Sequence, residues 1–178
     1  MSASAVQSST NGYLGFVTPM HRALRFTGLV ASSLVFGLTL AHVLQSPGSR
    51  GLDGPTWLIV QHTFYGGFAV VGGAAEIVGL VASGGDAMLS RRRPCGAIAP
   101  AFSSLCLFGT LVSYYFGNRP VNAEVAGWTP GTLPADWTSF RQTWEIAHAL
   151  SALLGAVAFI TLLAVTIWQP TVTTKAHR

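Results

Sequence analysis

The stretch Trp144–Trp168 reads WEIAHALSALLGAVAFITLLAVTIW, and it contains no charged residue after Glu145. An α-helix rises about 1.5 Å per residue, so about 20 apolar residues cross the roughly 30 Å hydrocarbon core of a membrane. This stretch exceeds that minimum without interruption by a charge. It therefore predicts a membrane-spanning helix over residues 144–168.

Three further stretches of the 178-residue chain have the same character. They are Phe26–Leu44, Trp57–Ala82 and Ala97–Gly117. Charged residues make up only 9% of the chain, whereas a soluble domain usually carries about 25%. Four such stretches with short connections predict an all-α integral membrane protein, a four-transmembrane-helix up-down bundle. We expect this domain to cover residues 22–170, between flexible tails at 1–21 and 171–178.

Basic residues decide the expected orientation, because cytoplasmic loops carry the excess of Lys and Arg. With the N-terminus inside, seven basic residues face the cytoplasm and three face outward. The seven are Arg22, Arg25, Arg91, Arg92, Arg93, Lys175 and Arg178, and the three are Arg50, Arg119 and Arg141. We therefore expect both ends of the chain in the cytoplasm, in a multi-pass protein of a bacterial cytoplasmic membrane. The net charge of +4 reflects this topology, so nucleic acid is not an expected partner.

Asn118–Phe140 is the longest connection between the predicted spans. Its prolines and tryptophans are Pro120, Pro130, Pro134, Trp128 and Trp137. Proline opposes a regular helix, and tryptophan suits a membrane interface. We expect an irregular segment that lies over the outer mouth of the bundle. Ser139 and Gln142 then have the spacing of a capping box, which predicts that the fourth helix starts before the membrane.

Polar side chains gather near the outer ends of all four predicted spans. They are His42, Gln61, His62, Tyr114, Tyr115, Asn118, Arg119, Arg141, Glu145 and His148. Ionisable groups inside a membrane are costly unless they meet partners, and they are commonly functional. Ser151 and Gly155 form a pair of small residues that lets another helix approach, so the face bearing His148 should point into the bundle. We predict one pocket, lined by His62, Asn122, Glu145 and His148.

Two plainer interpretations stay open for these residues. The aromatic side chains can form an interfacial belt, and Glu145, Arg141 and the histidines can form a network that only holds helices together. Glu76 stands apart from the cluster, toward the cytoplasmic end of its span. There it can snorkel toward the Arg91–Arg93 run.

The segment Asn118-Arg119-Pro120-Val121-Asn122, the Trp- and Pro-rich loop after it, and Trp144-Glu145-Ile146-Ala147-His148 resemble a family of small membrane proteins. This is the broad family typified by the fungal anthrone oxygenases, whose members are similar in length, in four spans and in a Trp-x-x-x-His final helix. The likeness covers about 24–168, and its specific part is the later portion. Many members carry an arginine shortly after the histidine, where this chain has Ser151.

The resemblance implies a membrane oxygenase that converts a flat, anthrone-like polyketide to an anthraquinone with O2 and without a metal or flavin. A histidine would act as the base, amide or guanidinium donors would stabilise the enolate oxygen, and aromatic side chains would line the pocket. The catalytic candidates are His148, His62, Asn122 and Glu145, and the substrate-binding candidates are Trp144, Tyr114, Asn118 and Arg119. Membrane lipids and a hydrophobic small molecule are the expected partners, and no cofactor is expected.

A metal or haem protein is the main alternative. His42, His62, Glu145 and His148 are acceptable ligands for Cu, Fe or Zn, and two facing histidines would suit haem. Glu145 and His148 have the Glu-x-x-His spacing of di-iron bundles, but the pair occurs once, where those sites need it twice. A homo-oligomer, or a non-catalytic accessory subunit of a larger membrane complex, is the third class. We favour the enzyme.

Overall fold

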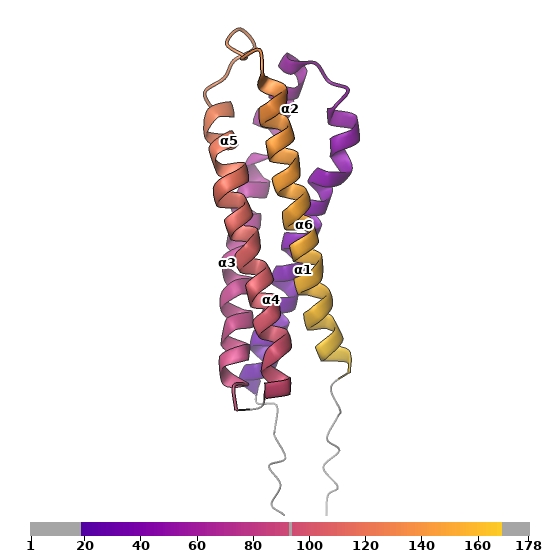
Figure 1. Ribbon diagram of the computed structural model, residues 1–178, viewed down its shortest axis with the longest axis vertical. Coiled ribbons are helices and arrows are strands. Elements are labelled where there is room, and N and C mark those ends of the chain that lie inside the picture. The colour runs from indigo at the N-terminus through magenta and orange to yellow at the C-terminus, as the bar shows by residue number, and fades with distance from the viewer. Residues whose placement is uncertain (1–18, 93, 169–178) are drawn as a thin grey trace, which may run out of the picture.

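The computed structural model describes residues 19–92 and 94–168, and the described part of the chain is helical without a strand (Figure 1). Its long helices are α1 (Pro19–Ser49), α3 (Gly66–Leu89), α4 (Pro94–Ser113) and α6 (Trp137–Ile167). Short segments at one end of the bundle are α2 (Gly54–Phe64), the π-helix η1 (Tyr114–Asn118) and α5 (Arg119–Val125). Four helices are long and apolar enough to cross a membrane, which confirms a multi-pass membrane protein with a four-helix bundle. The predicted tails lie outside the described residues, except that α1 begins three residues before the predicted domain.

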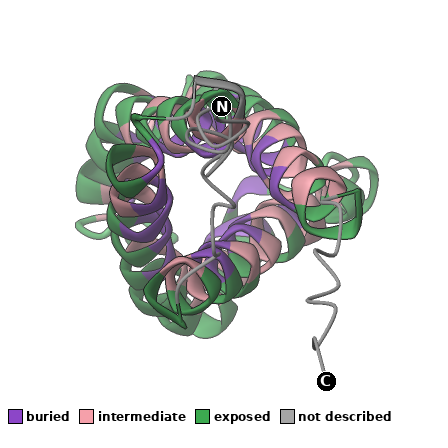
Figure 2. Cartoon of the chain, turned by 90° about the horizontal axis from the view of Figure 1, so that it is seen from below, coloured by how far each residue is buried: buried purple, intermediate pink, exposed green. Residues whose placement is uncertain are grey.

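The four long helices pack around a common axis in an up-down arrangement. α1 contacts α3 and α6, and α4 contacts the same two helices on the opposite side of the bundle. Buried residues face the axis and exposed residues face outward (Figure 2). The central core contains Val35, Leu107 and Ala158. At Gly155 an added Cβ would lie 3.1 Å from the Phe36 backbone, so this small residue brings α6 against α1 as predicted.

The second predicted span is not one continuous helix. It is divided at Tyr65 into α2 and α3, directly before Gly66 and Gly67. Glycine lowers helix stability because it has the largest backbone entropy to lose, which explains a break at this point. α2 itself begins behind Asp53, whose side chain accepts a hydrogen bond of 2.9 Å from the Thr56 backbone N–H. Hydrogen bonds from the Thr56 side chain and from its backbone N–H lower the pKa of the Asp53 carboxyl.

The third predicted span continues further than expected, through η1 and α5 to Val125. The prediction that prolines prevent a helix from Asn118 onward is therefore wrong for Arg119–Val125. In η1 the Arg119 backbone N–H bonds the Tyr114 carbonyl, the i→i+5 pattern of a π-helix. Pro120 then falls in the first turn of α5, where its missing N–H costs no helical hydrogen bond.

The capping box predicted at Ser139 does not form. α6 begins two residues earlier at Trp137, and the Ser139 hydroxyl donates to the Asp136 carbonyl at 2.8 Å. The earlier start places the Trp137 ring against Trp57, with ring centroids 5.4 Å apart. This contact between the buried Trp57 ring and the half-buried Trp137 ring favours the earlier start of the helix.

A second apolar cluster closes the end of the bundle that carries α2 and α5, which we call the outer end. Its buried members are Trp57, Leu58, Val121, Val125 and Trp144, with Trp128, Leu133, Trp137 and Phe140 packed against them. The Trp128 and Phe140 rings meet edge to face at 5.0 Å. The segment that follows α5 thus lies over the outer end, where the sequence placed it.

The orientation of the bundle is open to a direct test. α1 begins and α6 ends at the same end of the molecule, opposite the outer end (Figure 1). We expect that end to be cytoplasmic, because Arg91 and Arg92 follow α3 there. Single cysteines at Arg92 and Thr132, in a background without native cysteines, should react differently with an impermeant thiol reagent on intact cells. Thr132→Cys should label and Arg92→Cys should not; the reverse pattern would invert the topology.

Candidate functional site

A cavity of about 410 Å³ lies in the outer half of the bundle, between α1, α2, α3, α6 and the η1–α5 segment. We call it the outer cavity. Its polar and aromatic lining includes His42, His62, Tyr65, Glu76, Trp144 and His148. Of the four residues predicted to share one pocket, His62, Asn122 and His148 border this cavity. Tyr114, Asn118 and Trp144, predicted to bind a substrate, also border it.

His42 is the most enclosed histidine of the site. Only 5% of the residue is exposed, and its ring lies 4.3–4.9 Å, centroid to centroid, from four other rings. These rings are Tyr65, Phe68, Trp144 and His148. His42 Nδ1 is buried without a hydrogen-bond partner among the described residues. A buried polar atom without a partner is costly, and this one belongs to a side chain that lines the cavity.

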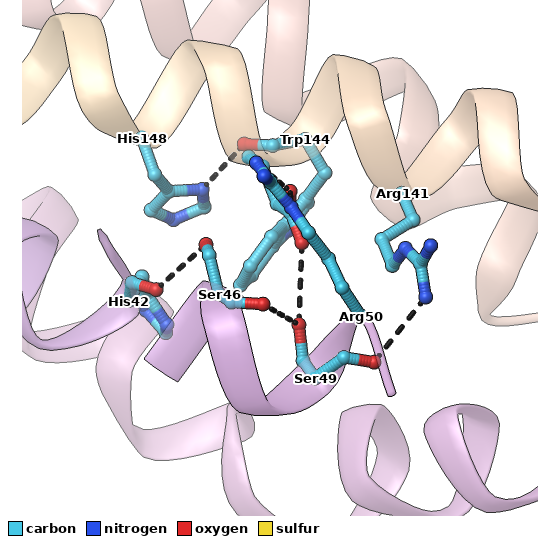
Figure 3. A network of polar contacts seen from close by, with 8 residues as sticks. His42, Ser46, Ser49, Arg50, Arg141, Trp144 and His148 are labelled. Atoms are coloured by element: carbon cyan, nitrogen blue, oxygen red, sulfur yellow. Dashed lines mark hydrogen bonds and ion pairs between the residues drawn. The ribbon is translucent and has the colours of Figure 1, made fainter. Parts of the chain in front are cut away.

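His148 projects from α6 toward His42 on α1 (Figure 3). Its Nδ1 lies 2.6 Å from the Asn118 amide nitrogen and 2.9 Å from the Trp144 carbonyl oxygen. The Asn118 amide also donates to that carbonyl, at 3.1 Å. With its proton on Nε2, His148 accepts at Nδ1 from the Asn118 NH2; with its proton on Nδ1, it donates to the Trp144 carbonyl. Both contacts hold Nδ1, so they fix the orientation of the ring.

The remaining amides and histidines of the cavity have distinct partners. The Trp144 indole N–H donates to the Asn122 side-chain oxygen at 3.1 Å, which leaves the amide NH2 of Asn122 as the group able to donate to a ligand. His62 Nε2 lies 2.9 Å from the Val125 carbonyl oxygen, so it links α2 to α5. That bond occupies one ring nitrogen of His62 and makes it a poorer candidate for the base than His42.

Glu145 does not belong to the outer cavity, which corrects its predicted catalytic place. Its carboxylate faces α1, where Arg50 binds it at 2.8 Å and the Ser49 hydroxyl donates to it at 3.2 Å (Figure 3). Neither the expected Arg141 nor a histidine is its partner; Arg141 donates to the Ser49 carbonyl instead, at 3.2 Å. The sequence could not indicate Arg50, because that residue is distant in the chain and was assigned to a loop.

Arg119 also lies away from the cavity. Its guanidinium stacks over the Tyr115 ring at 4.9 Å, and it is not part of the cavity wall. A cation over an aromatic face at a membrane interface is a stable arrangement in itself. Arg119 therefore does not border the cavity in which we expected it to bind a substrate.

Glu76 borders the inner end of the cavity and is only 7% exposed. Snorkelling toward Arg91–Arg93 is therefore wrong. Tyr65, Ala69 and Gly72 precede Glu76 at helical spacing, and all four residues line the cavity. Phe68, eight residues before Glu76, also lines the cavity, and sequence reasoning did not single it out. The i, i+4 and i+7 spacing of Tyr65, Ala69 and Gly72 was the sequence signal that could have placed these residues in one site with Glu76.

The cavity is continuous with the outer surface of the bundle. Ile77 and Tyr114 both border it and are 57% and 39% exposed. Glycines at Gly66 and Gly73 keep the wall thin, since an added Cβ at either would meet no atom within 4 Å. In a membrane these positions face lipid, so an apolar molecule can reach the cavity from the bilayer.

The predicted metal ligands do not converge. Glu145 binds Arg50, and His62 contacts a backbone carbonyl. Within 19–92 and 94–168 no three His, Cys, Asp or Glu side chains are grouped as a metal site. Axial histidines bind opposite faces of a haem, and the rings of His42 and His148 are in direct contact, which leaves no space for a macrocycle between them.

Comparisons of this chain with protein-family profiles, with curated proteins and with solved structures find no match.

Proposed function

We propose that this protein is a membrane oxygenase that takes a flat, apolar aromatic molecule from the outer leaflet and oxidises it with O2 without a cofactor. One observation carries the proposal. The outer cavity brings an unpartnered histidine, His42, against a second histidine whose ring is held by an amide, among aromatic side chains. A base, an oriented donor and a flat apolar wall are what enolate chemistry with O2 requires.

The reaction on an anthrone uses these groups in sequence. The unprotonated ring nitrogen of His42 accepts the proton of the acidic C–H bond, and the electron pair of that bond enters the enolate. His148 Nε2–H and the Asn122 NH2 stabilise the enolate oxygen. The enolate carbon bonds one oxygen atom of O2, and the resulting peroxide takes the proton back from His42. Loss of the second C–H proton with cleavage of the O–O bond releases water and leaves the new C=O, so one O2 is consumed for each anthraquinone.

Oxygen uptake tests this proposal. Purified protein in lipid nanodiscs should consume O2 in the presence of anthrone, with one anthraquinone formed for each O2 and with full activity in a metal chelator. A rate equal to that of empty nanodiscs would refute the oxygenase. Activity that the chelator removes would instead favour a metal enzyme.

A further inference from the structure

Glu76 is exceptional among the acidic residues of the chain. Of the six acids, three are buried: Glu76, Asp86 and Glu145. Asp86 has Arg25 at 2.9 Å, and Glu145 has Arg50 at 2.8 Å. No basic side chain in the described part of the chain forms an ion pair with Glu76. Its contact is the Thr110 hydroxyl on α4.

The Thr110 hydroxyl restricts what Glu76 can present to the cavity. The Thr110 hydroxyl has one hydrogen, which it donates either to the Leu107 carbonyl, at 2.7 Å, or to a Glu76 oxygen. If Glu76 is protonated and donates its O–H to Thr110, its C=O is left to accept from a ligand. An ionised Glu76 would present oxygen acceptors as well. In either state, the group available to a ligand is a hydrogen-bond acceptor.

The position of Glu76 sets its distance from the histidines. The Phe68 ring touches His42, and Glu76 follows eight residues later on the same helix. At about 1.5 Å per residue this separation is about 12 Å along α3. Below Glu76 the bundle is closed by the apolar core around Leu107 and Ala158, both fully buried. Glu76 therefore lies at the inner end of the cavity, where the core closes the bundle along its axis.

The surroundings of Glu76 favour a neutral ligand group over a cation. The aromatic side chains that could surround a cation, Tyr65, Phe68 and Trp144, gather around His42 at the other end of the cavity. The cavity-lining residues that neighbour Glu76 along α3 are Gly72, Gly73 and Ile77. These residues offer no ring face to a positive charge.

We propose that Glu76 is the specificity-determining residue of the outer cavity and accepts a hydrogen bond from a neutral hydroxyl at the end of the ligand remote from the histidines. This inference rests on the proposed binding of a flat aromatic molecule. Glu76 would favour a ring system that carries a phenolic hydroxyl at the end remote from the reacting carbon. The same ring system without this hydroxyl would bind more weakly.

Paired ligands and paired variants test the proposal by equilibrium binding, without turnover. Wild-type protein in nanodiscs should bind 2-hydroxyanthraquinone about three- to tenfold more tightly than anthraquinone, the range expected for one net hydrogen bond. Glu76→Leu should remove this preference. Glu76→Gln should keep it, because its NH2 can donate to Thr110 while its C=O accepts from the ligand. The exposed acid Glu124 on α5 supplies the control, and Glu124→Gln should bind both ligands as the wild type does.

Other outcomes overturn the inference. In one, the wild type binds both ligands equally; in another, the preference for 2-hydroxyanthraquinone persists in Glu76→Leu. Either result would show that Glu76 does not bind the hydroxyl. Tighter binding of 10-methylacridinium than of the hydroxyl ligand, lost in Glu76→Gln, would make Glu76 the counter-ion of an organic cation. Oxygen uptake is measured separately, so a hydroxyl preference without turnover would retain this inference and reject the oxygenase.

Discussion

Replacing His42 with alanine should lower the turnover number for anthrone about 100-fold or more, while binding of anthraquinone changes little. A positioned general base typically contributes about 10²- to 10⁴-fold to a rate. His42 is the histidine whose ring makes no hydrogen bond with the described residues, whereas Nδ1 of His148 is engaged by Asn118. Stopped-flow absorbance of the anthraquinone product gives kcat and KM separately, and the loss should appear in kcat.

A structural role for His42 makes a different prediction. If its ring only packs among Tyr65, Phe68 and Trp144, His42→Phe should be as active as the wild type. As a base, His42 cannot be replaced by phenylalanine, but added imidazole should restore part of the activity of His42→Ala by entering the space left behind. Full activity of His42→Phe, or no gain in activity of His42→Ala with imidazole, would assign the proton transfer to another group. Glu124→Gln controls for effects of mutation on reconstitution, because Glu124 is exposed outside the cavity.

The membrane architecture was predictable because it depends on local composition. Uninterrupted apolar length, as in 144–168, forces a spanning helix wherever it occurs in the fold. The inward face of His148 was predictable for a related reason. Ser151 and Gly155 permit close approach on one side only, and both are buried against the bundle in the structure.

Partner choice was not predictable, because it depends on contacts between residues far apart in the chain. Glu145 could bind Arg141 or a histidine as far as spacing indicates, and the pairing with Arg50 across 95 positions needs the register of α1 against α6. The continuation of the third span was hidden for another reason. The π-helix Tyr114–Asn118 changes the helical register just before Pro120, and no residue pattern in the sequence predicts it.

The end of the bundle opposite the outer end shows the same limit, and the second prediction with a large effect concerns it. Asp86 was placed in a loop, and Arg25 was regarded as a topology signal; in the structure α3 runs through Asp86, which is fully buried. Arg25 donates to Asp86 Oδ2 through two nitrogens, at 2.9 and 3.0 Å, and His21 Nδ1 lies 2.8 Å from Oδ1. These contacts tie the start of α1 to the end of α3.

Asp86→Ala should therefore destabilise the bundle by about 3–5 kcal/mol, the usual cost of leaving one buried charge without its partner. Unfolding in mixed detergent micelles with increasing SDS measures this free energy. Arg25→Leu combined with Asp86→Leu should recover most of the loss, because removing both charges leaves no uncompensated ion. The exposed acid Glu124 again gives the matched control, with Glu124→Ala expected within about 0.5 kcal/mol of the wild type. A double variant no more stable than Asp86→Ala would mean that packing around Asp86, rather than its charge, holds α1 to α3.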